Sequence, residues 1–224
     1  MLTVAEFAER KEIGVQRVHQ LLDEGLLPHK KYGNRVLIYG EALKWRPRRS
    51  RPLAERMREA LAAELCGVRQ SEPLSGNEQF RLRKHLTRLE HDNGAQLFAD
   101  LFAGRGRLHR YRVHPEDIRD LREDERILLS GISHGDSNLA AEDFVEGYVR
   151  QENLNGLMRN YLLEADPVGQ VKLRIGEVLP ELLSAYSVAD LADWESPREL
   201  REAERVLSKL LLERRQREAC SDRP

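Results

Sequence analysis

Residues 2–45 read LTVAEFAERKEIGVQRVHQLLDEGLLPHKKYGNRVLIYGEALKW, and this stretch decides the fold of the first part of the chain. Thr3 can cap a helix, because its hydroxyl oxygen can accept a hydrogen bond from a backbone N–H of the first turn. The apolar residues that follow recur at helical spacing, at Val4, Phe7 and Ala8. The pattern predicts a short helix over residues 4–10.

A second helix is predicted over residues 15–24. It lies between Gly14, which breaks the first pattern, and Gly25, which can end a helix. Four residues make its apolar face: Val15, Val18, Leu21 and Leu22. His19 stands at the border of the two faces, and we expect it to pack. With the apolar face turned inward, three polar side chains point outward: Gln16, Arg17 and Gln20.

A small β-hairpin should follow the second helix. The turn pair Gly33-Asn34 separates polar residues 29–32 from the β-prone residues 36–39. Two helices this short cannot bury their own apolar faces. We therefore expect the hairpin and the apolar residues Ala42, Leu43 and Trp45 to complete the core.

This stretch resembles the excisionase and MerR-like family of winged helix-turn-helix domains over about 43 residues. The resemblance is carried by Leu2-Thr3-Val4, Glu6, Ala8, Gly14-Val15, Arg17-Val18, Leu21-Leu22, Glu24-Gly25-Leu26-Leu27-Pro28, Gly33 and Arg35. It implies a DNA-binding domain at residues 1–45, with the hairpin as the wing. Because Gln can bond adenine and Arg can bond guanine in the major groove, we expect Gln16, Arg17 and Gln20 to read base edges.

The charge distribution favours the same end of the chain. The net charge is −1, but residues 1–60 carry 13 Lys and Arg against 8 Asp and Glu. The hairpin residues Lys30, Lys31 and Arg35 are candidates for contact with the phosphate backbone or the minor groove. A proline- and arginine-rich linker at residues 46–52 adds further candidates, for which a solvated linker is an equal alternative: Arg46, Arg48 and Arg49.

The remainder of the chain, residues 53–212, is predicted to form a helical segment followed by a small α/β region. Helices are expected at residues 53–65, 77–90, 95–103 and 152–163, from Pro115 and from Pro197, and strands at residues 107–113, 126–131, 142–149 and 171–175. Residues 213–224 are expected to be a charged, disordered tail. The predicted fold class is therefore α+β, mostly helical.

This second part resembles the C-terminal region of the actinobacterial AbiEi-like antitoxins of type IV toxin–antitoxin systems. The similar residues are Arg51-Pro52-Leu53, Leu128-Leu129-Ser130-Gly131, Val145-Glu146-Gly147-Tyr148-Val149 and Val171-Lys172-Leu173-Arg174-Ile175. The chain departs from the family at Ala54-Glu55-Arg56-Met57, where an aromatic-rich motif is usual. The resemblance implies an autorepressor whose second domain recognises a partner, such as a nucleotidyltransferase-type toxin.

Several sets of polar residues have the residue types of an active site but not the sequence spacing that such a site requires. Ser130, His134 and Asp136 lie on one short loop, whereas a hydrolase triad gathers residues from separate segments. The Gly104-Arg105-Gly106-Arg107 sequence lacks the strand-to-helix setting of a phosphate-binding loop and indicates a turn. The histidines show no metal-ligand spacing, and the acidic residues 116–125 indicate a solvated helix face. We therefore expect no enzyme activity, cofactor or metal.

The expected function is sequence-specific regulation of transcription, with double-stranded DNA as partner and a homodimer as a possible state. The chain has neither a membrane-spanning run nor a signal-peptide pattern at its start, so a cytoplasmic location is expected. Two alternatives remain. One is an excisionase-like recombination directionality factor, and the other is an enzyme with a DNA-targeting domain.

Overall fold

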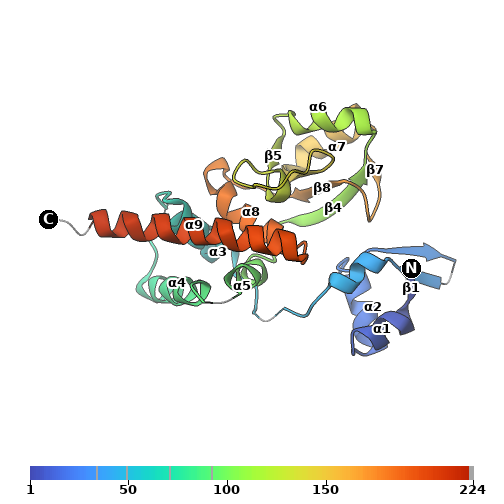
Figure 1. Cartoon of the computed structure of the whole chain (residues 1–224), viewed down its shortest axis with the longest axis horizontal. Coiled ribbons are helices and arrows are strands. Elements are labelled where there is room, and N and C mark those ends of the chain that lie inside the picture. The colour runs from blue at the N-terminus through green and yellow to red at the C-terminus, as the bar shows by residue number, and fades with distance from the viewer. Residues whose placement is uncertain (34, 49, 71, 92, 222–224) are drawn as a thin grey trace. The chain divides into compact units, whose positions relative to one another are not determined.

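The computed structural model describes residues 1–33, 35–48, 50–70, 72–91 and 93–221. The chain combines helices with two small sheets and divides into two compact units, Met1–Pro47 and Arg48–Pro224 (Figure 1). The division falls inside residues 46–52, whose described members belong to neither helix nor strand. None of the helices in the described residues is long and apolar enough to cross a membrane.

The first unit contains two helices and a three-stranded antiparallel sheet. Its elements are β1 (Leu2–Thr3), α1 (Val4–Arg10), α2 (Val15–Asp23), β2 (His29–Tyr32), β3 (Arg35–Ile38) and the 3-10 helix η1 (Gly40–Lys44). The strand order is β1-β3-β2. The predicted helices and the β2–β3 hairpin are confirmed, and α2 ends one residue before the predicted Glu24. Strand β1 was not predicted, because two residues are too few to show an alternating pattern.

The core of the first unit draws on every one of these elements except β2. Phe7, Val18, Leu21, Leu27 and Ile38 are at most 1% exposed. Ala42 is buried with them, and Leu43 and Trp45 pack against this core, which confirms the expected contribution of η1 and the residue after it.

Val15 was expected in the core but is 47% exposed. Helical side chains tilt toward the N-terminus of their helix, so a side chain in the first turn of α2 projects past the helix start. This part of the predicted apolar face is therefore wrong.

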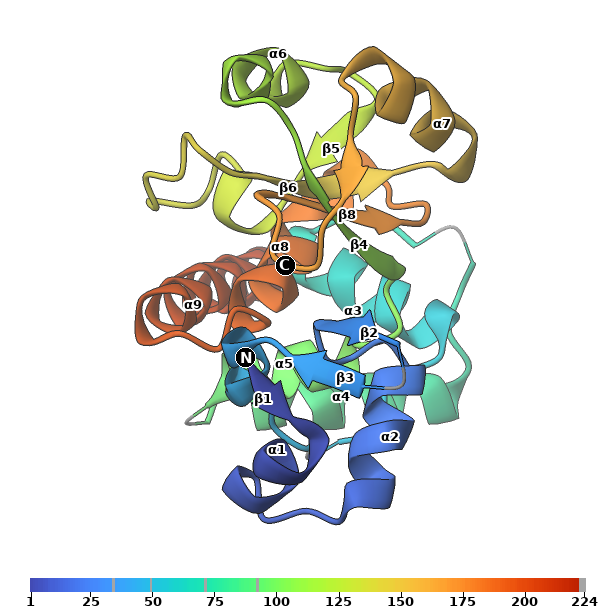
Figure 2. The ribbon, with the colours of Figure 1, turned by 90° about the vertical axis from the view of Figure 1, so that its right-hand side faces the viewer.

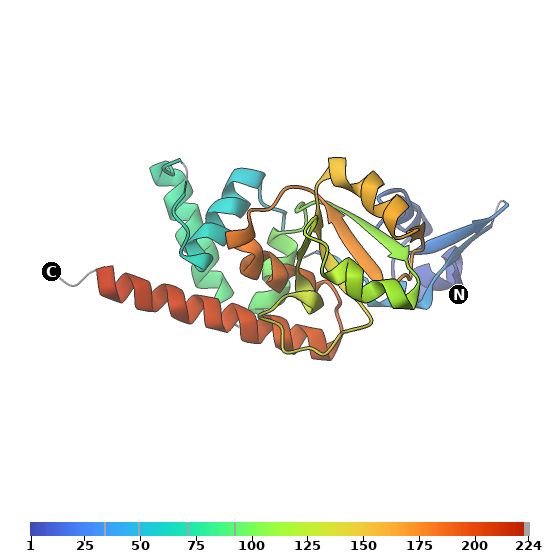
Figure 3. The same cartoon turned by 90° about the horizontal axis from the view of Figure 1, so that it is seen from above.

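The second unit builds its larger core from five helices: α3 (Glu55–Cys66), α4 (Gly76–Leu89), α5 (Gly94–Leu101), α8 (Leu183–Ala192) and α9 (Pro197–Ser221). Figure 3 shows α9 running along the unit. Helix α8 was not predicted. Its residues Leu183 to Ala192 are buried almost throughout, with Ser184 alone half-buried, so they show no amphipathic period.

The second sheet has the strand order β5-β6-β8-β4-β7. Its strands are β4 (Arg107–Arg112), β5 (Ile127–Leu129), β6 (Val145–Val149), β7 (Glu164–Ala165) and β8 (Val171–Ile175); β6 and β8 are parallel, and the other pairs are antiparallel. Helices α6 (Ile118–Arg122), which follows the 3-10 helix η2 (Pro115–Asp117), and α7 (Gln151–Asn160) lie on one side of the sheet, and α8 lies on the other (Figure 2). Two short 3-10 helices, η3 (Gly131–Ser133) and η4 (Pro180–Leu182), complete the unit.

The predicted disordered tail is wrong as far as Ser221, because α9 continues to that residue. The Arg214 Nε donates to Glu64 Oε1 over 2.9 Å. The Arg217 guanidinium donates to the backbone oxygens of Glu64 and Leu65 over 3.1 and 2.7 Å. These contacts hold the charged turns of α9 against the end of α3, which local sequence could not show. The expected tail residues Asp222, Arg223 and Pro224 lie outside the described residues.

Candidate nucleic-acid interface

The solvent-facing side of α2 carries the three polar side chains selected from the sequence. Gln16, Arg17 and Gln20 are all exposed, while Val18, Leu21 and Leu22 face the core. At 100° per residue, Gln16 and Gln20 lie nearly opposite the middle of this buried side. Arg17 lies on one flank. The polar face of α2, defined by Gln16, Arg17 and Gln20, therefore presents exposed amide and guanidinium groups.

Arg17 has partners on its own helix. Its Nη1 donates to Gln20 Oε1 over 3.1 Å and lies 3.5 Å from Glu24 Oε1. Both ionic side chains are about half exposed, so the pair is weak. A base contact by Arg17 would have to compete with Glu24, which the sequence alone did not indicate.

The hairpin has two different faces. Lys31 pairs with Val36, and side chains of directly opposed residues share a face. Lys30 and Tyr32 lie on the other face, where the Lys30 Nζ sits 5.2 Å from the centre of the Tyr32 ring. Arg35 is opposite Tyr32 and shares that second face. The three basic residues expected to act together are thus divided, with Lys31 on one face and Lys30 and Arg35 on the other.

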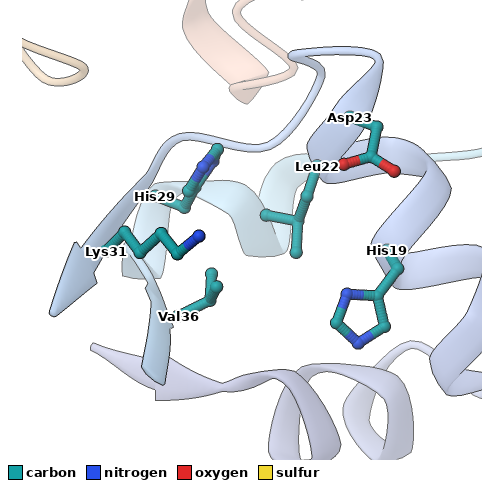
Figure 4. A pocket seen from close by; sticks show the side chains of 6 residues that line it. All are labelled: His19, Leu22, Asp23, His29, Lys31 and Val36. Carbon is teal, nitrogen blue, oxygen red and sulfur yellow. The ribbon is translucent and has the colours of Figure 1, made fainter. Parts of the chain in front are cut away.

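A pocket of about 370 Å³ lies between α2 and the hairpin. It is lined by His19, Leu22, Asp23, His29, Lys31 and Val36 (Figure 4). Figure 4 shows the Lys31 side chain reaching from the hairpin toward α2, with His19 and Asp23 on the opposite wall. We call this space the α2–hairpin pocket.

His19 was expected to pack but is exposed. It lies roughly 100° around the helix from the centre of the buried side of α2, too far to reach the core. That expectation is wrong. Instead, His19 joins the polar face of α2 to the α2–hairpin pocket, because it is one turn from Gln16 and also lines the pocket.

Charge is unevenly spread within the first unit. Residues 1–24 contain 3 basic residues (Lys and Arg) and 5 acidic residues (Asp and Glu). Residues 25–47 contain 5 basic residues and 1 acidic residue. The hairpin and the segment after it therefore form the positive part of this unit, and residues 1–24, with α1 and α2, the negative part. A polyanion would be drawn to the hairpin side.

The linker arginines differ in exposure. Arg48 is exposed, and Arg46 is half-buried. Arg49 lies outside the described residues.

The loop with Ser130, His134 and Asp136 forms no triad. Asp136 accepts hydrogen bonds from Ser184 Oγ at 2.7 Å and Lys209 Nζ at 3.0 Å. The Asp136 Oδ2 is 3.7 Å from His134 Nδ1. Ser130 is buried, and its hydroxyl oxygen has no hydrogen-bond partner among the described residues. Asp136 therefore ties the loop to α8 and α9 and does not orient His134 toward a serine.

The turn at residues 104–107 has a structural use that the sequence did not suggest. Arg105 is buried, and its Nε donates to Asp190 Oδ1 over 2.9 Å. It also pairs with Asp193. Arg174 on β8 reaches the same two carboxylates, with its Nε 2.8 Å from Asp190 Oδ1 and its Nη2 2.5 Å from Asp193 Oδ2. Arg105 is therefore committed to a buried ionic cluster.

A second buried pair extends this cluster. Lys172 Nζ on β8 lies 2.6 Å from Glu146 Oε1 on β6. The other oxygen, Glu146 Oε2, accepts hydrogen bonds from Trp194 Nε1 at 2.8 Å and from the backbone N–H of Ile132 at 3.1 Å. Burial lowers the pKa of Lys172, while Glu146 acts to raise it. The charged groups are thus paired with one another, which favours a structural role, although Ser130 Oγ, Glu146 Oε1 and Asp190 Oδ2 make no hydrogen bond among the described residues.

Most of the acidic stretch at residues 116–125 is exposed, as expected. Asp117 and Asp124 are half-buried, and Asp124 is bound by neighbouring side chains. It accepts hydrogen bonds from Arg126 Nη2 at 2.6 Å and Tyr161 Oη at 2.9 Å, and these bonds help to lower its pKa to about 2.

Within the described residues, no group of three or more His, Cys, Asp or Glu side chains is arranged to hold a metal ion. No protein-family model, curated protein or solved structure matches the chain.

Proposed function

We propose that this chain is a sequence-specific DNA-binding regulator of transcription whose first unit is a winged helix-turn-helix. The observation that carries the proposal is the polar face of α2, which stands exposed beside a basic hairpin. An α-helix fits the major groove, where glutamine and arginine side chains can distinguish base pairs. In this proposal α2 is the recognition helix, and the β2–β3 hairpin is the wing.

The division of the hairpin into two faces refines the roles of its basic residues. Lys30 and Arg35 share a face with Tyr32 and would contact the backbone or the minor groove beside the recognition helix. Lys31 would contact the backbone of the DNA strand that passes between the hairpin and α2. Phosphate contacts of this kind orient the protein on DNA without reading its sequence.

The narrower proposal is an autorepressor and antitoxin of a toxin–antitoxin pair. It rests on the AbiEi-like resemblance of the second unit. The large second unit, Arg48–Pro224, argues against a recombination directionality factor, since such factors are usually small. Co-expression with a neighbouring nucleotidyltransferase gene, scored by growth, tests this narrower role.

Selection from a library of random duplexes tests the central proposal. The full chain should enrich a common motif. It should bind that motif with an affinity that falls steeply as salt rises. A Gln16→Ala, Gln20→Ala double variant should keep weak binding but lose the motif. Gln216→Ala on α9 is the matched control, because it removes an equally exposed amide from the other unit. Binding without an enriched motif would contradict the regulatory role.

A further inference from the structure

We infer that the α2–hairpin pocket is a phosphate-binding site that seats one backbone phosphate of the bound duplex through Lys31, His19 and His29. The inference rests on the proposed function and goes beyond it by assigning His19 and His29, which that function leaves without a role, to the phosphate contact of Lys31. It is carried by the chemistry of the residues lining the pocket and by the position of the pocket beside the polar face of α2.

The cationic groups of the pocket come from both of its walls. Lys31 and His29 are two residues apart on β2, so their side chains lie on the same face of the hairpin. His19 stands on α2 across the pocket (Figure 4). A phosphate placed between the walls would meet an ammonium group on one side and an imidazole on each side. The volume of about 370 Å³ leaves room for the phosphate and water.

His29 is oriented for this role by a local contact. Its Nδ1 lies 3.0 Å from the backbone oxygen of Leu27, so Nδ1 carries the hydrogen and donates it. The other ring nitrogen, Nε2, is then the atom that gains a proton when the imidazole becomes charged. A phosphate near Nε2 would favour the charged form.

One lining residue opposes an anion. Asp23 lies one turn after His19 on α2 and faces the same pocket. With both imidazoles neutral, the charges of Asp23 and Lys31 cancel. When the imidazoles are protonated, the pocket carries a net positive charge. An anion attracts protons onto neighbouring imidazoles, so occupation of the pocket by phosphate should take up protons.

The test uses the full chain and a fluorescent duplex of random sequence, because a phosphate contact does not depend on bases. Binding should strengthen by about tenfold between pH 8 and pH 6. His19→Gln and His29→Gln should each remove a large part of this gain, whereas His91→Gln, which changes an exposed histidine of the second unit, should leave it unchanged.

Two further variants test the sign of the charge effect. Lys31→Gln should weaken binding about tenfold and reduce the dependence of log affinity on log salt by about one phosphate contact. Asp23→Asn should strengthen binding at pH 8. Ring-nitrogen NMR of His19 and His29 should show that added duplex raises the protonated fraction of both rings at fixed pH.

The outcomes separate the two proposals. If duplex binding by the His19 and His29 variants no longer strengthens at lower pH, the phosphate-binding role of the pocket is supported. Tight duplex binding with a flat pH profile, or with a profile that survives both substitutions, overturns the pocket and leaves the proposed function standing. Failure to bind duplex at any pH at low salt overturns the proposed function and the pocket together.

Discussion

Arg105 and Asp190, 85 residues apart in the chain, form an ion pair of 2.9 Å in which both side chains are almost wholly buried. The pair joins the turn before β4 to α8. Arg174 of β8 bonds to the same carboxylate. Asp190 therefore links one helix to two segments of the sheet.

Asp190→Asn should destabilise the second unit by about 3–5 kcal/mol, because it removes one of the two carboxylates that two buried guanidinium groups share and leaves them only Asp193. Urea denaturation followed by circular dichroism would measure the loss. Asp120→Asn on α6 is the matched control, because Asp120 is exposed. Equal unfolding midpoints for the two variants would show that the cluster contributes little to stability.

Gly131 occupies a position that only glycine fits. Its φ is +55°, and an added Cβ would come within 2.1 Å of Glu146 Oε2. Gly131→Ala should therefore displace the carboxylate that pairs with Lys172 and cost more than about 1 kcal/mol. Gly135→Ala, four residues along the same loop, has no atom within 4 Å of its added Cβ and should be nearly neutral. Thermal melting of the two variants compares these costs directly.

Stability should fall as the pH is lowered, in two separate ranges. Burial lowers the pKa values of His85, His109 and His134, so the unfolded chain takes up these protons first, and stability is lost as the pH falls below the ordinary value of 6.5. Burial of Asp190 opposes its ionisation. Arg105 and Arg174 outweigh that effect and lower its pKa from 3.8 to about 2, so its contribution is lost as the pH falls from about 4 toward 2.

Denaturation curves at a series of pH values would show both ranges. His134→Gln should reduce the fall between about pH 7 and pH 5, with the remainder due to His85 and His109, and leave the acid range unchanged. An unchanged profile in that variant would rule out His134 as a source of the upper range.

Arg17→Ala and Arg48→Ala should have different effects on DNA binding. If Arg17 bonds a guanine, its loss should reduce discrimination between the selected motif and random DNA by about 1–3 kcal/mol. Arg48 can reach only the backbone, so Arg48→Ala should weaken both complexes alike. Arg10→Ala on α1 controls for the loss of an exposed arginine from the first unit. Equal losses on both DNAs for Arg17→Ala would remove it from base recognition.

Glu24→Gln should strengthen binding to any duplex by a few fold. The change removes a negative charge from the flank of the polar face and frees Arg17 from its 3.5 Å contact. Glu9→Gln on α1 removes an equally exposed carboxylate on the negative part of the unit and should have less effect. Fluorescence anisotropy at several salt concentrations would separate the two variants.

Local patterns in the sequence predicted the first unit well. The helix start at Thr3 is a capping box with Glu6, and both partners lie within four residues. The sequence identified the apolar side of α2 except at Val15, which is exposed because it is the first residue of the helix. Helix α8 escaped prediction because burial of nearly all its residues removes the periodic signal.

Contacts between distant segments account for most of what the sequence did not show. Arg105 appeared as part of a glycine-rich turn, and nothing near it in sequence indicates Asp190. The α2–hairpin pocket also depends on two elements, because His19 and Lys31 meet only when the hairpin folds back beside α2. The sequence pattern of one helix or strand shows which of its sides is polar. It does not show which side chains from different elements come together in the fold.

The contact between Arg217 and the end of α3 has a consequence for the order of events during synthesis. The first unit has its own core and can fold as soon as residues 1–47 leave the ribosome. The end of α3 gains its contacts with α9 only when residues about 150 positions later have been made. At about 5–20 residues per second, roughly ten to thirty seconds pass with the first unit folded and the second still incomplete. Each nascent chain thus spends that interval with a finished N-terminal unit and with the apolar surface of the second unit exposed to chaperones and proteases.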